Sequence, residues 1–75
     1  GTVDLAKYEK LDSYWRSLGV AAPARRGLVD NKILKLSDVK KWREADFLKI
    51  HAIGPKAVAI ITKEMRTNKI HFKRK

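Results

Sequence analysis

The two prolines of this chain constrain its fold more than any other residues, because each follows a small residue and opens a stretch with helical apolar spacing. Proline fits the first turn of a helix, where its missing N–H is not needed, and it breaks a helix interior. Pro23 therefore predicts a helix over Ala24 to Asn31, and Pro55 predicts a longer helix to about Thr67. The segments that begin at the two prolines form a weak repeat.

The N-terminal part of the chain has the pattern of one continuous helix. From Asp4 to Leu18, apolar or aromatic residues recur at steps of three and four, which is the period of one helical face. Gly19 is then expected to end this helix in the left-handed conformation, and Asn31 is expected to do the same for the next helix.

The middle of the chain predicts two shorter helices. Ser37 has the side chain of an N-cap and is followed by Asp38, an acid in a favourable first turn, so a helix is expected over Asp38 to Trp42. Residues 43–46 then lead into a further short helix around Phe47.

Together these signals predict the all-α fold class, as a compact bundle of four to five short helices with a helical hairpin at its C-terminal end. Residues 1–75 are long enough for a single domain with one hydrophobic core, which we place at about residues 5–67. The basic tail, residues 68–75, is expected to lay Ile70 and Phe72 back on that core.

The composition excludes several classes of site. No cysteine is present, which excludes disulfides and thiolate chemistry, and the His and carboxylate residues do not cluster as zinc ligands would. No nucleophile with an activating base occurs, so we expect no enzyme, no small-molecule substrate and no cofactor. The longest apolar run, residues 57–61, is far below the roughly 20 residues of a membrane span, which predicts a cytoplasmic protein without a membrane partner.

The charge of the chain favours a polyanionic partner. Eighteen Lys and Arg residues stand against 8 Asp and Glu, for a net charge of +10. The surplus lies in the C-terminal two thirds, because residues 1–22 are balanced whereas residues 51–75 contain seven basic residues and one acidic residue. The alternative is that these lysines and arginines only form solvated helix faces.

The most informative segment is residues 47–61, which read as a short amphipathic helix, a tight turn and a second helix. Gly54 would let the backbone turn sharply and leave no side chain above the amides that follow. Those amides and the positive end of the helix dipole favour a phosphate, and Lys56 adds a full charge. Ile53 would be an apolar plug that holds the hairpin on the core, and Ala57 would let the two helices approach closely.

This segment resembles the helix-hairpin-helix family, whose usual hairpin reads Leu-Pro-Gly-Ile-Gly-Pro followed by Lys and small residues. His51 stands where the family has proline, and Ala52 stands where it has the first glycine. A hairpin that needs glycine backbone angles at this position would be distorted by Ala52 and would bind phosphate less well. The matching positions are Ile50, Ile53, Gly54, Pro55, Lys56, Ala57 and Val58.

The wider stretch from Leu18 to Met65 is similar to the C-terminal domain of the bacterial RNA polymerase α subunit and its small stand-alone relatives. The resemblance implies a compact four- or five-helix domain. In such relatives the hairpin amides and a basic residue from an opposing helix hold DNA phosphates on the minor groove side. The positions carried over to this chain are the backbone of Gly54, Lys56 and Ala57, the Lys56 side chain, and Arg25 or Arg26.

Other residues have both a functional and a structural interpretation. Lys63 lies two turns after Lys56 on one helix face, where the two lysines track phosphates or are simply solvated. His51 has two alternative roles: it contacts a phosphate or a base edge, or it only hydrogen-bonds a neighbouring carbonyl. Trp15 and Trp42 are expected to be core aromatics, because helical spacing explains both.

The sequence therefore predicts a non-catalytic nucleic-acid-binding module that contacts DNA phosphates with little sequence specificity. Double-stranded DNA is the preferred partner, and RNA is an alternative because a hairpin amide meets phosphate before a 2′-hydroxyl. The rival hypothesis is a protein-interaction module, since the helix arrangement also resembles sterile-alpha-motif-like domains. A structural tether inside a larger polypeptide is the third hypothesis.

Overall fold

The computed structural model describes residues 5–74, and the described chain is helical with one isolated β-bridge, between Arg43 and Lys73. The predicted all-α fold class is therefore confirmed, although the described residues form six helices where five were expected. These are α1 (Leu5–Leu11), α2 (Ser13–Ser17), α3 (Ala22–Asp30), α4 (Leu36–Val39), α5 (Glu44–Leu48) and α6 (Pro55–Thr67).

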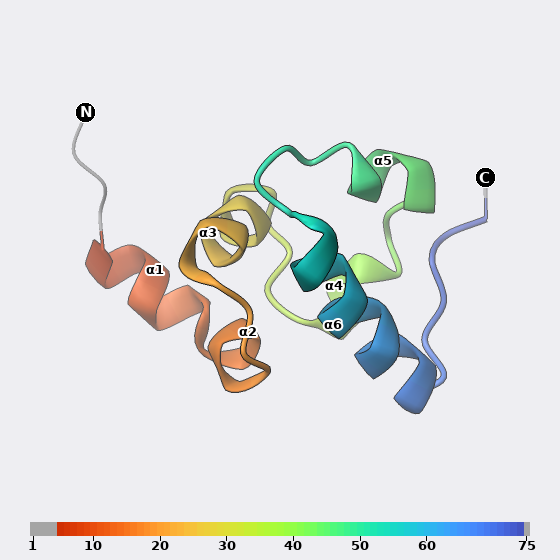
Figure 1. The fold of residues 1–75 in the computed structure, drawn as a ribbon, viewed down its shortest axis with the longest axis horizontal. Helices are drawn as coiled ribbons and strands as arrows, with labels where there is room; N and C mark the ends of the chain where they lie inside the picture. Colours follow the sequence, from red (N-terminus) through yellow and green to blue (C-terminus); the bar gives the residue numbers. More distant parts are fainter. Residues whose placement is uncertain (1–4, 75) are drawn as a thin grey trace.

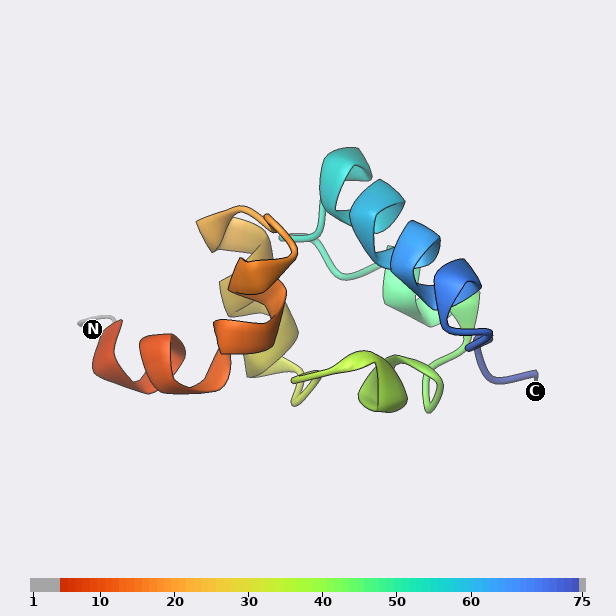
Figure 2. The ribbon, with the colours of Figure 1, turned by 90° about the horizontal axis from the view of Figure 1, so that it is seen from below.

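The helices form two hairpins, α2 with α3 and α5 with α6, which α4 connects (Figure 1). The molecule is elongated, with principal extents of 36 × 22 × 20 Å. Figure 2 shows α1 at one end of the long axis and the C-terminal tail at the other, with α4 lying across the base between the hairpins. The turn before α6 reaches back towards α3, so the two hairpins meet in the middle of the molecule.

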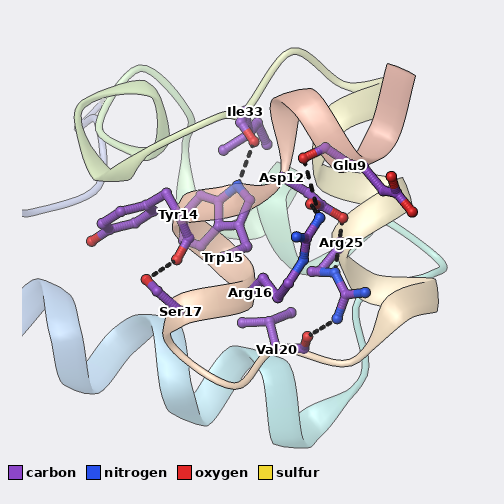
Figure 3. Close-up of polar contacts among 9 residues, drawn as sticks. All are labelled: Glu9, Asp12, Tyr14, Trp15, Arg16, Ser17, Val20, Arg25 and Ile33. Atoms are coloured by element: carbon purple, nitrogen blue, oxygen red, sulfur yellow. Dashed lines mark hydrogen bonds and ion pairs between the residues drawn. The ribbon is translucent and has the colours of Figure 1, made fainter. Parts of the chain in front are cut away.

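The expected single helix over residues 4–18 is wrong within the described residues, because the chain bends at Asp12. Asp12 has φ −101° and ψ 9°, outside the helical region, and α2 turns away from the axis of α1 (Figure 2). The cause lies in the Asp12 side chain. Asp12 is only 3% exposed, and its carboxylate is paired with the guanidinium groups of Arg16 and Arg25 (Figure 3).

The hydrophobic core joins all the helices from α2 to α6. Trp15 is fully buried, as expected, and its Nε1 donates to the Ile33 carbonyl at 2.8 Å. Trp42 is only half-buried at the edge of the core. The buried cluster consists of Trp15, Val20, Ala24, Leu28, Ile33, Leu36, Val39, Phe47, Ile53, Ala57, Ile61 and Met65.

Helix α2 ends as the sequence predicted. Gly19 has φ +84° and follows the last turn, and the Val20 N–H donates to the Trp15 carbonyl at 3.1 Å. This is the Schellman arrangement, in which a left-handed residue closes the helix and an apolar residue after it packs on the core.

Helices α3 and α6 end in the same arrangement through one repeated tripeptide, Asn-Lys-Ile, at residues 31–33 and 68–70. The expected left-handed conformation of Asn31 is wrong, since Lys32 has φ 61° and Lys69 has φ 57°. Each asparagine instead turns its side-chain amide back to the carbonyl four residues earlier, at 2.8 Å. The Asn-Lys-Ile tripeptide therefore ends both helices, and its left-handed residue is the lysine rather than the asparagine.

Helix α4 starts earlier than expected. Ser37 is not its N-cap but lies inside it, and the helix covers Leu36–Val39 where residues 38–42 were predicted. Asp38 accounts for this shift, because its carboxylate accepts the N–H of Leu34 at 2.9 Å and stabilises the preceding turn from within the helix. The predicted burial of Val39 is confirmed.

The C-terminal tail packs on the core as the sequence predicted. The rings of Phe72 and Phe47 lie 5.3 Å apart, and Ile70 packs against the same core. The Lys73 N–H then donates to the Trp42 carbonyl at 2.8 Å, which fixes the tail beside the chain between α4 and α5.

Candidate nucleic-acid interface

The predicted hairpin is formed by α5, residues 49–54 and α6. The Ile53 N–H donates to the Ile50 carbonyl at 3.1 Å and closes the turn. Ile53 is buried in the core, which confirms its expected role as an apolar plug. Ala57, in the first turn of α6, is also buried, in agreement with the expected close approach.

Ala52 does not need the backbone angles of glycine, because its φ is not positive. The hairpin therefore forms without the family's first glycine. Space for the Ala52 methyl group comes from α3, where a Cβ added to Gly27 would lie 2.8 Å from the Ala52 Cβ. Helix α3 can thus contact the hairpin turn directly.

This contact gives a first testable expectation. Gly27→Ala gains about 1 kcal/mol of helix propensity but overpacks the contact, which costs about 1–3 kcal/mol. A net loss of about 1 kcal/mol is expected in urea unfolding, whereas in an Ala52→Gly background the same substitution should stabilise the domain by about 1 kcal/mol. An equal effect of Gly27→Ala in both backgrounds would contradict the direct contact.

Gly54 has φ −82° and ψ 177°, an extended conformation that any residue can adopt. A Cβ added at this position would meet no heavy atom within 4 Å. The expectation that the turn requires glycine here is therefore wrong. What the missing side chain leaves is open space beside the N-cap of α6.

Those amides have no internal partner. The first hydrogen bond of α6 runs from the Val58 N–H to the Gly54 carbonyl at 3.0 Å, so within the described residues the N–H groups of Lys56 and Ala57 donate to no acceptor. Pro55 has no N–H to compete. The start of α6 therefore has the free donors and the positive dipole end that favour an anion.

The start of α3 lies opposite the start of α6. Helix α3 begins after its N-cap Ala21 with proline in its first turn, and its first hydrogen bond runs from the Arg25 N–H to the Ala21 carbonyl at 2.9 Å. Both helix starts border one hollow of about 170 Å³. Its lining contains no acidic residue and consists of Gly19, Ala21, Pro23, Ala24, Ala52, Gly54, Lys56, Ala57 and Ile60.

The weak sequence repeat at the two prolines therefore has a structural counterpart. When the two helices are aligned at their N-caps, the prolines no longer coincide, because Pro55 is the first residue of α6 whereas Pro23 is the second residue of α3. The structural repeat is therefore shifted by one position from the sequence repeat. The buried residues Val20, Ala24 and Leu28 of one hairpin correspond to Ile53, Ala57 and Ile61 of the other. The start of α3 was missed as a candidate site, and this repeat was the signal that pointed to it.

The remaining predicted residues lie outside this hollow. The Arg25 side chain turns inward: its Nε is paired with Asp12 at 2.9 Å, and its Nη1 donates to the Val20 carbonyl at 2.7 Å (Figure 3). Arg26 lines a separate hollow of about 330 Å³ beside α1. His51 and Lys63 are exposed but do not line the hollow between the helix starts.

The burial of Asp12 affects its ionisation. Burial by itself raises the pKa of the Asp12 carboxyl, but the hydrogen bonds and charges of Arg25 and Arg16 outweigh it, so the pKa lies below its usual value of 3.8. Asp12 is therefore a carboxylate at neutral pH. It neutralises the positive charge of Arg25, which the sequence predicted to contact phosphate.

Comparison with known proteins adds no assignment. No protein-family model, no curated protein and no solved structure matches the chain. None of the helices in residues 5–74 is long and apolar enough to cross a membrane.

Proposed function

We propose that this protein is a non-catalytic, cytoplasmic nucleic-acid-binding domain that holds the sugar-phosphate backbone of double-stranded DNA at the hollow between α3 and α6. The observation that carries the proposal is the convergence of two helix N-termini on one hollow without acidic lining, with Lys56 among its lining residues. Unpaired amides at a helix start bind phosphate oxygens, and the dipole of each helix adds to the attraction.

The contacts of this kind carry little sequence information. Backbone amides and a lysine read phosphates rather than base edges, so different duplex sequences should bind with similar affinity. The net charge of +10 adds a long-range attraction to any duplex. Protein binding through the same hairpin is the competing function, and it would not require free amides or salt-sensitive affinity.

The proposal predicts a steep salt dependence. If three or four phosphates are neutralised, the slope of log affinity against log salt concentration is about −3 to −4 for a duplex. The exposed Lys56 should contribute one of these contacts, so Lys56→Gln is expected to reduce the slope by about 1. Fluorescence anisotropy of a labelled duplex, titrated at several salt concentrations, measures both values.

The matched control is Lys10→Gln, which removes the same charge from the exposed face of α1. It should leave the slope nearly unchanged, because Lys10 lies on α1 and does not line the hollow. Equal slopes for the Lys56 variant and the parent protein would exclude the hollow as the phosphate site. Tighter binding to duplex RNA than to duplex DNA would replace the proposed partner.

A further inference from the structure

A second basic surface is formed where the loop between α4 and α5 meets the C-terminal tail, which lies at the end of the molecule opposite α1 (Figure 2). It is made of Lys40, Lys41, Trp42, Arg43, Lys73 and Arg74, here called the Trp42 surface. We propose that the Trp42 surface binds a second segment of duplex DNA, so that one copy of the domain bridges two duplexes. This inference rests on the proposed function for its first duplex, which the hollow between α3 and α6 holds.

The fold assembles this surface from two distant parts of the sequence. The Lys73 N–H donates to the Trp42 carbonyl at 2.8 Å, and Arg43 and Lys73 form the parallel β-bridge. The contact of Phe72 with Phe47 at 5.3 Å anchors the tail just before this bridge. The backbone of Lys73 is therefore held against the basic loop between α4 and α5.

The charge of the Trp42 surface is largely uncompensated. All five of its basic side chains are exposed. Of these five side chains, only Lys41 makes an ion pair with a described residue, namely Asp38 at 3.6 Å, and the Lys41 side chain remains 74% exposed. A pair with this exposure is screened by water and contributes little. Like charges collected in this way, without a structural use, fit a polyanion.

Trp42 gives this surface an aromatic centre. The Trp42 Nε1–H donates to no described residue. Every buried side-chain nitrogen in residues 5–74 has a hydrogen-bond partner, so the Nε1 of Trp42 must be exposed to solvent. Trp15, in contrast, is fully buried and donates to Ile33. A half-buried indole between Lys41 and Arg43 presents an apolar ring face together with an N–H that can donate to a phosphate oxygen.

The two surfaces cannot share one short run of phosphates. Helix α6 has 13 residues and so spans about 20 Å, with the hollow at its start and the tail at its end. They also lie on opposite flanks of α6. The hollow between the helix starts is lined by Lys56, Ala57 and Ile60. A second hollow is lined by Val58, Thr62 and Met65 of α6, together with Glu44 and the tail residues Ile70, His71 and Phe72. The second surface is therefore placed for a second duplex segment.

A two-duplex capture assay tests the proposal. One duplex is attached to beads and a second, fluorescent duplex is free, and co-capture by the parent protein is measured at low salt. The triple variant Lys40→Gln, Lys41→Gln, Lys73→Gln should lower co-capture about tenfold, while its binding to a single duplex through the hollow persists. All three side chains are exposed, and circular dichroism checks that the variant remains folded.

Fluorescence of Trp42 separates this proposal from the proposed function. Duplex DNA should change the emission of Trp42 in the parent protein and in a Gly54→Asp variant, and the change should be lost in the triple variant. If Gly54→Asp leaves single-duplex affinity unchanged while the Trp42 response persists, the hollow is not the first site but the Trp42 surface still binds DNA.

Two outcomes overturn the second site. Co-capture by the triple variant at the parent level would show that bridging does not use the Trp42 surface. A Trp42 response to vesicles containing phosphatidylserine, with no response to duplex DNA, would assign the surface to an anionic membrane instead.

Discussion

Replacing Gly54 with aspartate is expected to weaken duplex binding by about 10- to 100-fold while leaving the domain at least as stable as the parent protein. A hydrogen bond to a charged group contributes about 1.5–3 kcal/mol, and a carboxylate at the start of α6 would compete with phosphate for the amides of Lys56 and Ala57. Anisotropy titrations of a labelled duplex measure the loss.

Stability should be retained because Gly54 is the N-cap of α6 in an extended conformation, with no heavy atom within 4 Å of an added Cβ. Aspartate and asparagine are both preferred N-caps, so each fits this position and stabilises the helix by a few tenths of a kcal/mol over glycine. Thermal unfolding followed by circular dichroism checks this part of the expectation.

Gly54→Asn is the matched control, since it has the same shape as the aspartate variant and differs from it in charge. It should bind more tightly than Gly54→Asp, because its side chain blocks the amides without repelling phosphate. If the two variants bind DNA equally and as well as the parent, phosphate does not approach the start of α6.

Replacing Asp12 with alanine is expected to destabilise the domain by about 2 kcal/mol, which lowers Tm by about 10 °C in a chain of this size. The substitution removes a buried carboxylate that accepts hydrogen bonds from Arg16 and Arg25 and that joins the bend between α1 and α2 to α3. The loss is smaller than for a fully buried pair, because the Arg16 side chain is 48% exposed. Thermal unfolding by circular dichroism measures it.

The same carboxylate predicts a pH dependence. Because the pKa of Asp12 is lowered in the folded protein, its contribution is present above the usual value of 3.8, which holds in the unfolded chain, and is lost as the pH falls through the lower folded-state pKa. The parent protein should therefore lose stability below about pH 4, and Asp12→Asn should lose less over the same range.

Glu9→Gln provides the control for this pH experiment, since Glu9 is an exposed carboxylate on α1 and the substitution makes the same change in charge. Its pH profile should follow that of the parent protein. An Asp12→Asn profile identical to the parent profile would show that acid unfolding depends on other carboxylates.

Local sequence was sufficient where the structure depends on local geometry. Helix α6 has the predicted bounds, because Gly54-Pro55 permits only one starting point and a regular apolar face follows it. The bend at Asp12 could not be predicted in the same way. At the bend, Asp12 pairs with Arg25, a residue in another helix, and the helical period of the sequence continues on both sides.

The candidate site shows the same difference between features set by local sequence and features set by contacts between distant segments. The roles of Ile53 and Ala57 followed from their spacing around the turn, and both residues are buried as expected. The pairing of Arg25 with Asp12, and the position of α3 opposite the start of α6, depend on contacts between distant segments. Sequence patterns describe which residues a helix carries, but only the packed chain determines which charges are already neutralised.

The contact between Gly27 and Ala52 has a consequence for how related sequences can change. The space between α3 and the hairpin turn holds a single methyl group, which this chain carries on the turn. A homologue that carries this methyl group on the helix instead would have alanine at position 27 and glycine at position 52. Substitution one residue at a time can connect the two arrangements through a glycine pair, whereas an alanine pair would force the helix and the turn apart. Exchange of these two residues should therefore occur in a fixed order during evolution, with loss of one methyl before gain of the other.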